Sequence, residues 1–422
     1  MIEAPKGTHD VLPEESARRE ALEGQLRRVL GSAGYRRIDT PIFEATELFA
    51  RGVGESSDIV QKEMYTFSDA GGRSLTLRPE GTASVCRAYI EHGMHKLAGP
   101  QKFFYLGPFF RAETPQRGRQ RQFSQIGAEV IGADSPETDA ELILLLAELL
   151  EAVGVHGTRL RIGSLGTPEL RAVYRAELRE YLRVHEAELP AEVRARIDLN
   201  PMRAFDSAAA AAVMAGAPRL LDRLGPEDAE HFHTVCGLLD GAGLTYEIDP
   251  TLVRGLDYYT RTLFEFTSDA LGAQSGVGGG GRYDGLIEAL GGQPTPGAGW
   301  AAGVERILLA AEAPAPTAPA PDLFVVPVPV GAPAPAPPAP AASPRAVAFS
   351  LTGAARHAGL SAQLELSGRS VKAALKHADR LGARYVALIG EEVALKEMES
   401  GQQRTLAGAE DVIPTILRGH RL

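Results

Sequence analysis

The sequence has few cysteines, no long apolar run and no lysine directly after a glycine. Only Cys86 and Cys236 occur in 422 residues. This excludes a disulfide framework and is typical of a reducing compartment, in which both would be plain buried residues. No stretch reaches the roughly 18 consecutive apolar residues of a membrane-spanning helix, and the first ten residues lack the apolar segment of a signal peptide. We therefore expect a cytoplasmic protein with no membrane partner.

Two enzyme classes are excluded by missing motifs. A P-loop requires a lysine directly after a glycine, and no such pair occurs. No Gly-x-Ser-x-Gly segment occurs either, so the nucleophile motif of serine hydrolases is absent. Any ATP site in this chain must therefore be of another type.

The composition is otherwise that of a globular protein. It is 44% hydrophobic and 23% charged, and its length is sufficient for two or three domains. The net charge of -10 argues against a polyanionic partner, but the charge is unevenly distributed. Residues 111–121 hold four arginines and one glutamate. This local positive segment leaves RNA binding open.

Pro/Ala-rich tracts at residues 312–321 and 331–344 favour extended, polyproline-like segments and divide the chain. Upstream, strand and helix patterns occur in mixed order, whereas an Ala-, Leu- and Arg-rich stretch indicates helices. Downstream, two buried-strand patterns flank an amphipathic helical pattern, and the second tract would extend a loop after the first strand. The predicted organisation is an α+β region at 1–164 and 246–311, a helical insertion at 165–245, a linker at 312–321 and a small α/β domain at 322–422.

The segment with the most specific chemistry is Phe-Phe-Arg-Ala-Glu at residues 109–113, followed by a Gln/Arg/Gly-rich stretch. We expect a strand, an arginine-rich turn and a second strand. The guanidinium of Arg111 can hold a phosphate bidentately, and a flexible loop of this composition can reach RNA. An exposed charged hairpin with no ligand is the alternative for the same residues.

A second motif occupies residues 296–309, where small residues lead into an apolar helix bearing Glu305 and Arg306 near its start. Glycines permit close approach of a ligand to the backbone. An arginine at this place can pair with a triphosphate or stack on a purine. Residues 34–44, a helix end, a strand and Pro41, carry little chemistry of their own.

Two further patterns suggest other functions and are weaker. Residues 276–281 satisfy Gly-x-Gly-x-x-Gly, which would indicate a nicotinamide-dependent oxidoreductase. That fingerprint needs a strand, a turn and a helix, with an acid about 20 residues on. His231, His233 and Cys236 could suggest zinc. However, residues two apart on a helix point in different directions and a fourth ligand is missing, so we expect a polar helical face.

The segments at 34–44, 109–113 and 296–309, in this order, resemble the three signature motifs of class II aminoacyl-tRNA synthetases. Residues 252–261, LVRGLDYYTR, and 275–284, SGVGGGGRYD, resemble the two histidine-specific motifs of histidyl-tRNA synthetases. The resemblance extends over nearly the whole chain. It implies a catalytic domain built on an antiparallel sheet with a helical insertion, a C-terminal anticodon-binding domain, and a homodimer.

The resemblance also assigns a histidine pocket. It implies that the α-amino group is bound by Glu80, Thr82 and Gln125. It implies that the two imidazole nitrogens are held by Glu129 and Tyr259, with Tyr258 completing the pocket. An imidazole offers one donor and one acceptor, which need opposite partners. Such a pocket rejects isosteres, because an analogue would leave buried polar groups unpaired.

The same resemblance implies an ATP site and a tRNA contact. Arg111 and Arg254 would be the catalytic residues, gripping the α-phosphate while the histidine carboxylate attacks it in line. The remaining ATP contacts would be Arg306 on the outer phosphates and adenine, Glu113 on the adenine amino group and Phe123 on its face. Mg²⁺ would bridge the phosphates without a dedicated protein metal site. The acceptor end of tRNA(His) would be contacted by Arg117, Arg119 and Gln120.

A regulatory, non-enzymatic relative is the main alternative to this ligase. The accessory subunit of ATP phosphoribosyltransferase has a synthetase-like catalytic domain that binds histidine and controls another enzyme. Such relatives tend to lose the histidine-specific motifs, the arginines and the C-terminal domain. This chain has Arg111, Arg254 and Arg306 together with a C-terminal domain, which favours the ligase.

Overall fold

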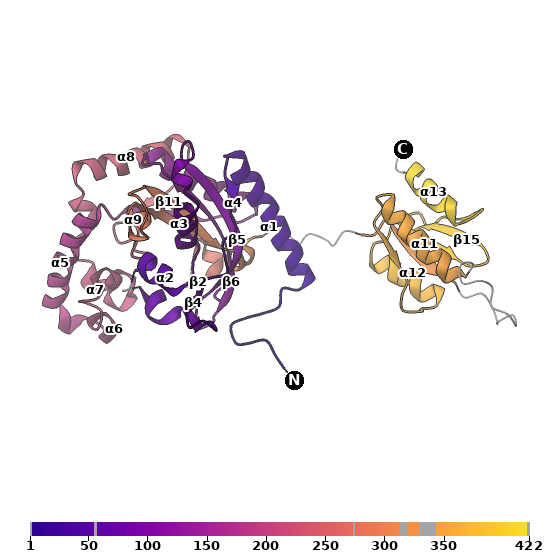
Figure 1. Ribbon diagram of the computed structural model, residues 1–422, viewed down its shortest axis with the longest axis horizontal. Helices are drawn as coiled ribbons and strands as arrows, with labels where there is room; N and C mark the ends of the chain where they lie inside the picture. The colour runs from indigo at the N-terminus through magenta and orange to yellow at the C-terminus, as the bar shows by residue number, and fades with distance from the viewer. Residues whose placement is uncertain (1, 55–56, 273–274, 313–319, 329–342, 420–422) are drawn as a thin grey trace. The chain divides into compact units, whose positions relative to one another are not determined.

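The computed structural model describes residues 2–54, 57–272, 275–312, 320–328 and 343–419. The chain forms two compact units, Met1–Pro316 and Thr317–Leu422 (Figure 1). No helix in the described part of the chain is long and apolar enough to span a bilayer. The tract at 331–344 and the linker at 312–321 lie mostly outside the described residues.

An eight-stranded sheet organises the first unit. In spatial order its strands are β1 (Arg36–Arg37), β5 (Gln101–Phe110), β6 (Gln122–Ile131), β11 (Gly297–Gly303), β10 (Gly276–Arg282), β9 (Thr260–Thr267), β7 (Arg159–Ser164) and β8 (Glu247–Ile248). The outermost pairs, β1 with β5 and β7 with β8, are parallel, and the other pairs are antiparallel. The predicted α+β class with an antiparallel catalytic sheet is confirmed.

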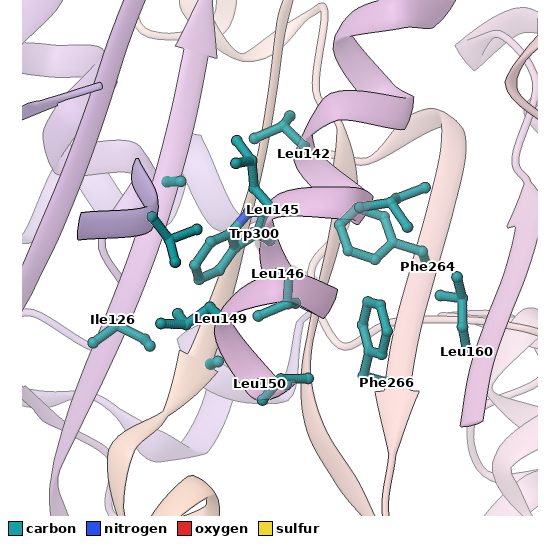
Figure 2. Packing of buried hydrophobic residues seen from close by; sticks show 14 of the residues in the cluster. Ile126, Leu142, Leu145, Leu146, Leu149, Leu150, Leu160, Phe264, Phe266 and Trp300 are labelled. Atoms are coloured by element: carbon teal, nitrogen blue, oxygen red, sulfur yellow. The ribbon is translucent and has the colours of Figure 1, made fainter. Parts of the chain in front are cut away.

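Helices α1 (Pro13–Ser32), α4 (Pro136–Ala152), α8 (Pro226–Gly241) and α10 (Val304–Ala310) cover one face of this sheet. Their leucines pack against alternate residues of the strands, and Figure 2 shows α4 residues meeting Ile126, Trp300 and Phe264. Each such buried side chain contributes about 1.5–3 kcal/mol. This apolar layer fixes the position of the strands, and therefore of the side chains on the opposite face of the sheet.

The opposite face carries α3 (Thr82–Glu91) and α9 (Leu286–Ala289), which pack on Phe103, Tyr105 and Phe109 of β5. Beside them lies a small antiparallel sheet of β2 (Phe43–Ala45), β4 (Ser74–Leu77) and β3 (Tyr65–Ser68), with α2 (Thr46–Val53) and a π-helix at Ile59–Glu63. Short 3-10 helices occupy Met94–Lys96 and Asp269–Leu271.

The helical insertion is less regular than its composition predicts. Helix α5 (Pro168–Val184) is long, but residues 185–225 form only short helices. These are α6 (Ala191–Arg194), α7 (Ala211–Met214) and 3-10 helices at Glu186–Glu188, Pro201–Asp206, Ala208–Ala210 and Leu220–Arg223. Its core gathers around Tyr174, Leu178 and Leu182. Helix α8 falls within residues 165–245, yet its apolar residues join the core of the main sheet.

The second unit is the predicted small α/β domain. Its sheet has the order β13 (Ala362–Leu364), β12 (Leu323–Pro327), β14 (Tyr385–Ile389), β15 (Val393–Glu397) and β16 (Gln403–Leu406). The first three strands are parallel and the last two are antiparallel to their neighbours. Helices α11 (Pro344–His357), α12 (Val371–Arg380) and α13 (Val412–Gly419) accompany the sheet, with a 3-10 helix at Ala409–Asp411.

Candidate active site

A cleft of about 760 Å³ opens on the sheet face opposite α1 and α4, between the strands and the helical insertion. Most of the site residues expected from the sequence line this one cleft. They are Glu80, Thr82, Arg111, Glu113, Arg119, Gln120, Phe123, Gln125, Arg254, Tyr258, Tyr259 and Arg306. The exceptions are Glu129, which lies fully buried beneath Thr82, and Arg117, which is exposed.

Alternation along β6 decides which side chains reach the cleft. Successive strand residues point to opposite faces. Ile126, Ala128 and Val130 therefore pack into the core under α4. The intervening Gln125 and Glu129 face the other way. The extended backbone of residues 122–131, predicted from their sequence, thus places both polar side chains on the face that carries the cleft.

Glu129 is the most completely buried acid of the site, with no exposed surface. Its carboxylate accepts hydrogen bonds from three hydroxyl groups: Oγ1 of Thr82 at 2.8 Å, Oη of Tyr283 at 2.7 Å and Oη of Tyr105 at 3.3 Å. The neighbouring residue across β11 is Gly299, and a Cβ there would overlap Oε2 of Glu129. A glycine is therefore required for the carboxylate to lie flat on the sheet.

The electrostatics of this acid are unusual. Burial raises the pKa of Glu129 to about 8, although the hydroxyls of Tyr283 and Thr82 lower it, and the negative charge of Glu80 adds to the rise. Burial also raises the pKa values of Tyr105 and Tyr283 well above their ordinary values, so both phenols stay protonated. A hydrogen-bond donor or a cation bound beside Glu129 would stabilise the charged form of its carboxyl group.

Tyr105 and Tyr283 are site residues that the sequence analysis did not assign. Tyr283 lies in the segment that resembles a histidine-specific motif. Tyr105 shares the period of two that brings Phe103 and Phe109 of β5 to this face. That period could have indicated Tyr105, but its bond to Glu129 depends on the pairing of β5 with β6.

Glu80 precedes α3 and satisfies the first amide groups of that helix. Its carboxylate accepts from the backbone N–H of Thr82 at 2.7 Å and of Ala83 at 3.0 Å. Burial raises its pKa while these N–H groups lower it. Tyr258 Oη donates to the same carboxylate at 3.5 Å. Nearby, Oε1 of Gln125 is buried and has no hydrogen-bond partner among the described residues.

Four of the arginines that line the cleft were expected from the sequence, and acidic side chains lie among them. Arg111 donates to the carbonyl of Pro79 at 2.9 Å and its guanidinium lies 5.3 Å from the ring centre of Phe123. Arg119 pairs with Glu113 at 3.3 Å. Arg306 donates to the carbonyl of Gly276. Burial lowers the pKa of Arg306, and the like charge of Arg119 lowers it further. An anion placed between two such guanidiniums would relieve their repulsion.

The fourth of these arginines, Arg254, projects over β10 and β9. It pairs with Glu265 of β9 at 2.7 Å, and Glu265 also lies 3.7 Å from Arg161. At Gly279 of β10 a Cβ would come within 3.2 Å of Nη2 of Arg254, and closer still to the backbone of Phe264 and Glu265. The glycine-rich strand thus makes room for an arginine above it.

The helical insertion supplies part of the cleft wall, which the sequence analysis did not anticipate. Arg203, Phe205 and Asp206 all line the cleft. Arg196 and Arg203 both pair with Asp58, at 3.0 and 3.4 Å, on the other side of the opening. The insertion and the catalytic sheet therefore form one site together.

Residues 111–121 form the predicted turn between two strands. Phe110 of β5 pairs with Gln122 of β6, and Gln116 bridges Arg119. Arg117 lies exposed in this turn, whereas Gln120 faces the cleft. The root of the loop is held by the carbonyl of Gly7, which accepts from the backbone N–H of Arg121 at 2.7 Å.

The two weaker patterns receive different explanations. Residues 276–282 are strand β10 in the middle of the sheet, and a strand cannot be the strand-to-helix turn of a dinucleotide fingerprint. Among the described residues, no group of three or more His, Cys, Asp or Glu could hold a metal ion. The expectation of a polar helical face was wrong for His231. It is buried and contacts Asp139 at 2.8 Å, because α8 packs on α4, while His233 is exposed.

Known proteins resemble this chain over its full length. A family model described as histidyl-tRNA synthetase matches residues 7–307, and one described as anticodon binding domain matches residues 323–417. The histidine–tRNA ligase of Halorhodospira halophila is 46% identical over 430 residues, covering 99% of this chain and 98% of the relative.

Solved structures share the fold. The apo histidyl-tRNA synthetase of S. aureus matches with a TM-score of 0.78 and 35% identity, covering 99% of this chain and 100% of its own. A Bacillus halodurans protein described as an ATP phosphoribosyltransferase regulatory subunit/histidyl-tRNA synthetase matches with a TM-score of 0.64, covering 89% and 96%. Its identity of 23% shows a common fold alone.

Proposed function

The chain belongs to the histidyl-tRNA synthetase family, and on that premise we propose that it ligates L-histidine to tRNA(His). It would first activate histidine with ATP to histidyl-adenylate and pyrophosphate, and then transfer histidine to the 3′-terminal adenosine. The observation that carries the proposal is the buried carboxylate of Glu129, held by three hydroxyls at the base of an arginine-lined cleft.

Glu129 and Tyr259 would hold the imidazole ring of histidine. An ionised Glu129 accepts one ring N–H, and the phenol of Tyr259, whose pKa burial raises, donates to the other nitrogen. Tyr258 closes the pocket beside them, with its ring centre 4.7 Å from that of Tyr259. A ligand without both ring nitrogens would leave at least one buried polar group unpaired, which accounts for specificity without proofreading.

The α-ammonium group of histidine would bind Glu80, Thr82 and Gln125. The unpartnered Oε1 of Gln125 supplies an acceptor that otherwise has no bond. The hydroxyl of Thr82 gives its hydrogen to Glu129, and its oxygen can still accept from an ammonium. Burial of these acceptors strengthens their attraction for a positive charge.

ATP would bind on the arginine side of the cleft. Arg111 and Arg254 grip the α-phosphate, Arg306 contacts the outer phosphates and adenine, and Glu113 and Phe123 bind the adenine amino group and ring face. A histidine carboxylate oxygen then forms a bond to the α-phosphorus as the bond to pyrophosphate breaks. The chain contributes position and fixed positive charge to this step.

ATP would enter as its magnesium complex. Magnesium sites commonly use one or two carboxylates plus the substrate phosphates, so a cage of protein ligands is not needed. The described residues contain no such cage, and the carboxylates of Glu113 and Glu265 line the cleft. The two carboxylates suit a metal ion that is bound mainly by the nucleotide. Mg²⁺ would neutralise the charge of the phosphates.

The tRNA would contact both units. Arg117, Arg119 and Gln120 would meet the acceptor end. The match of residues 323–417 to an anticodon binding domain supports anticodon contacts by the second unit. In the transfer step, a hydroxyl of the terminal adenosine forms an ester with the histidine carbonyl, and AMP leaves.

A homodimer is part of the proposal. Ile42, Phe43 and Phe67 are 46%, 52% and 43% exposed on or beside the three-stranded sheet, and the rings of Phe43 and Phe67 lie 6.2 Å apart. Exposed apolar clusters of this kind indicate a protein contact. Ile42 and Phe43 belong to residues 34–44, which resemble the dimer-forming motif, so a second copy is the occupant we propose. Light scattering should give twice the chain mass of 44.9 kDa.

Histidine-dependent exchange of pyrophosphate into ATP tests the activation step. Wild-type protein should exchange only when histidine is present, and Arg254→Ala should lower the rate by about 100-fold, because transition-state charge loses a fixed partner. A protein that binds histidine tightly but neither exchanges pyrophosphate nor charges tRNA would instead be the histidine-binding regulator.

A further inference from the structure

The short segment from Tyr258 to Arg261, which forms one wall of the proposed histidine pocket, is held by residues of the helical insertion. We propose that Arg171 and Arg261 are positioning residues that fix Tyr258 and Tyr259, so that the insertion sets the shape of the amino-acid pocket. The inference rests on the proposed function and adds to it a physical coupling between insertion and pocket.

Arg171 makes the first connection. It lies in the first turn of α5, the helix that begins the insertion, and its Nη1 donates to the backbone carbonyl of Tyr259. Burial lowers the pKa of this guanidinium, and the carboxylate of Asp257 nearby favours its charged form. A charged donor on a main-chain carbonyl restrains the backbone itself. The position of Tyr259 thus depends on where α5 lies.

Arg261 makes the second connection from the other end of the insertion. Its guanidinium pairs with Asp228 at 3.0 Å and Glu227 at 2.8 Å, both in the first turn of α8, and with Asp134 at 3.2 Å. Asp228 also accepts from the backbone N–H of Thr167, which caps α5. The carboxylate of Asp228 on α8 therefore contacts both the N-terminal cap of α5 and the pocket segment.

The backbone of Arg261 is strained, which indicates that its position is imposed. With φ at +42°, it is the one non-glycine residue in the left-handed region among the described residues. Its N–H donates to Gly166 at 2.9 Å, and its carbonyl accepts from Leu165 at 2.7 Å. A conformation of this cost persists only where its surroundings determine it.

Apolar packing supports the same coupling. Tyr259 is 5% exposed and belongs to the core of the insertion, together with Tyr174 and Leu178 of α5. Tyr258 packs against that core and also against the cluster under α3. The two tyrosines therefore lie at the boundary between insertion and catalytic sheet. A shift of α5 that alters this packing would alter the pocket, and occupation of the pocket would restrain α5 in return.

The test compares Arg171→Ala with Arg175→Ala in the full-length protein. Arg175 lies one turn along the same helix and also donates to a backbone carbonyl, that of Leu199 at 2.7 Å, but within the insertion. Arg171→Ala should raise the histidine KM in pyrophosphate exchange about tenfold, because a charge-assisted hydrogen bond to the pocket backbone is lost. The KM for ATP should stay unchanged, and Arg175→Ala should change neither value. Arg171→Lys should give an intermediate histidine KM.

Arg261→Gly supplies a second variant, since glycine tolerates the left-handed backbone and only the ion pairs are lost. It should also raise the histidine KM selectively, which keeps the proposal testable if Arg171→Ala does not fold. An unchanged histidine KM in both variants, or an equal rise for histidine and ATP, would overturn the coupling. If wild-type protein exchanges no pyrophosphate, the proposed ligase fails. In that case, histidine affinities of the same variants measured by calorimetry still test the coupling between the insertion and the pocket.

Discussion

At the scale of single residues, Glu129 combines the tightest burial in the site with a carboxylate that three hydroxyls hold in place. Its raised pKa means that the folded chain keeps a proton that the unfolded chain would release. Its contribution to stability is therefore present below the ordinary glutamate range and lost as pH rises through about 8. Burial of an acid is costly, and the three hydroxyls offset part of that cost.

Histidine binding should depend on pH through Glu129. If the imidazole N–H binds the ionised acid, binding releases a proton below pH 8, so histidine affinity should rise about fivefold from pH 7 to 8 and level off about twofold higher above pH 8. The ligand imidazole titrates near 6.5, below this window. Calorimetry across this range measures the slope. In Glu129→Gln the affinity should be lower and the slope should vanish, so a slope that survives would assign it to another group, such as Glu80.

Gly299→Ala should damage the pocket without adding a polar group. The new Cβ would overlap Oε2 of Glu129, so the carboxylate must move away from Tyr283 and Thr82. We expect a histidine KM raised at least about tenfold and a loss of about 1–3 kcal/mol in unfolding free energy. Gly237→Ala is the matched control: no atom lies near its Cβ position on α8, and it should be neutral or stabilising. Equal behaviour of the two variants would refute this account of Gly299.

At the scale of elements, α8 is attached to α4 and the sheet by a buried ionic network. Asp139 of α4 contacts His231 of α8 at 2.8 Å and Arg282 of β10 at 2.7 Å, and Arg282 has no exposed surface. Arg282 also pairs with Asp284, which hydrogen-bonds Thr260 beside the pocket. The network thus connects the packing of three elements.

Asp139→Ala should destabilise the fold by about 3 kcal/mol, because it leaves Arg282 and His231 buried without a shared acid. Urea unfolding measures the change. The control is Glu141→Ala on the same helix, whose pair with Lys102 is about one-third exposed and is worth under about 1 kcal/mol. A loss at Asp139 no larger than that at Glu141 would contradict a structural role for the network.

A substitution in the turn at residues 111–121 should affect the transfer step of the proposed reaction without affecting the activation step. Arg117 is exposed and lies outside the cleft, so Arg117→Ala should leave histidine-dependent pyrophosphate exchange unchanged. It should lower the rate of tRNA charging several-fold and weaken its dependence on salt, because one phosphate contact is lost. Exchange and charging that fall together would assign Arg117 to the ATP site instead.

The elements also show what the sequence can predict. The predicted order of a strand, an arginine-rich turn and a second strand after Phe109 is confirmed. In contrast, the glycine run at 276–281 is ambiguous, because its role as a strand depends on neighbours that fill the space of the missing side chains. His231 contacts Asp139, which is 92 positions away in the sequence, and Arg171 bonds to Tyr259, which is 88 positions away. No local pattern can reveal such contacts.

At the scale of the whole molecule, the proposed histidine and ATP contacts lie in the first unit, whereas the proposed tRNA contacts lie in both units. The proposed histidine and ATP contacts line a cleft within Met1–Pro316. The second unit has its own apolar core around Leu323, Leu351 and Ile389 and matches an anticodon binding domain. The Pro/Ala tracts between and within these parts lie mostly outside the described residues, and their role stays a prediction.

Charging of purified tRNA with radiolabelled histidine by the full chain tests the central claim most directly. With ATP and Mg²⁺ present, the protein should form acid-precipitable histidyl-tRNA on tRNA(His) and none on a tRNA for another amino acid. It should charge with no amino acid other than histidine. The absence of histidyl-tRNA, from protein that is folded and binds histidine by calorimetry, would contradict the account.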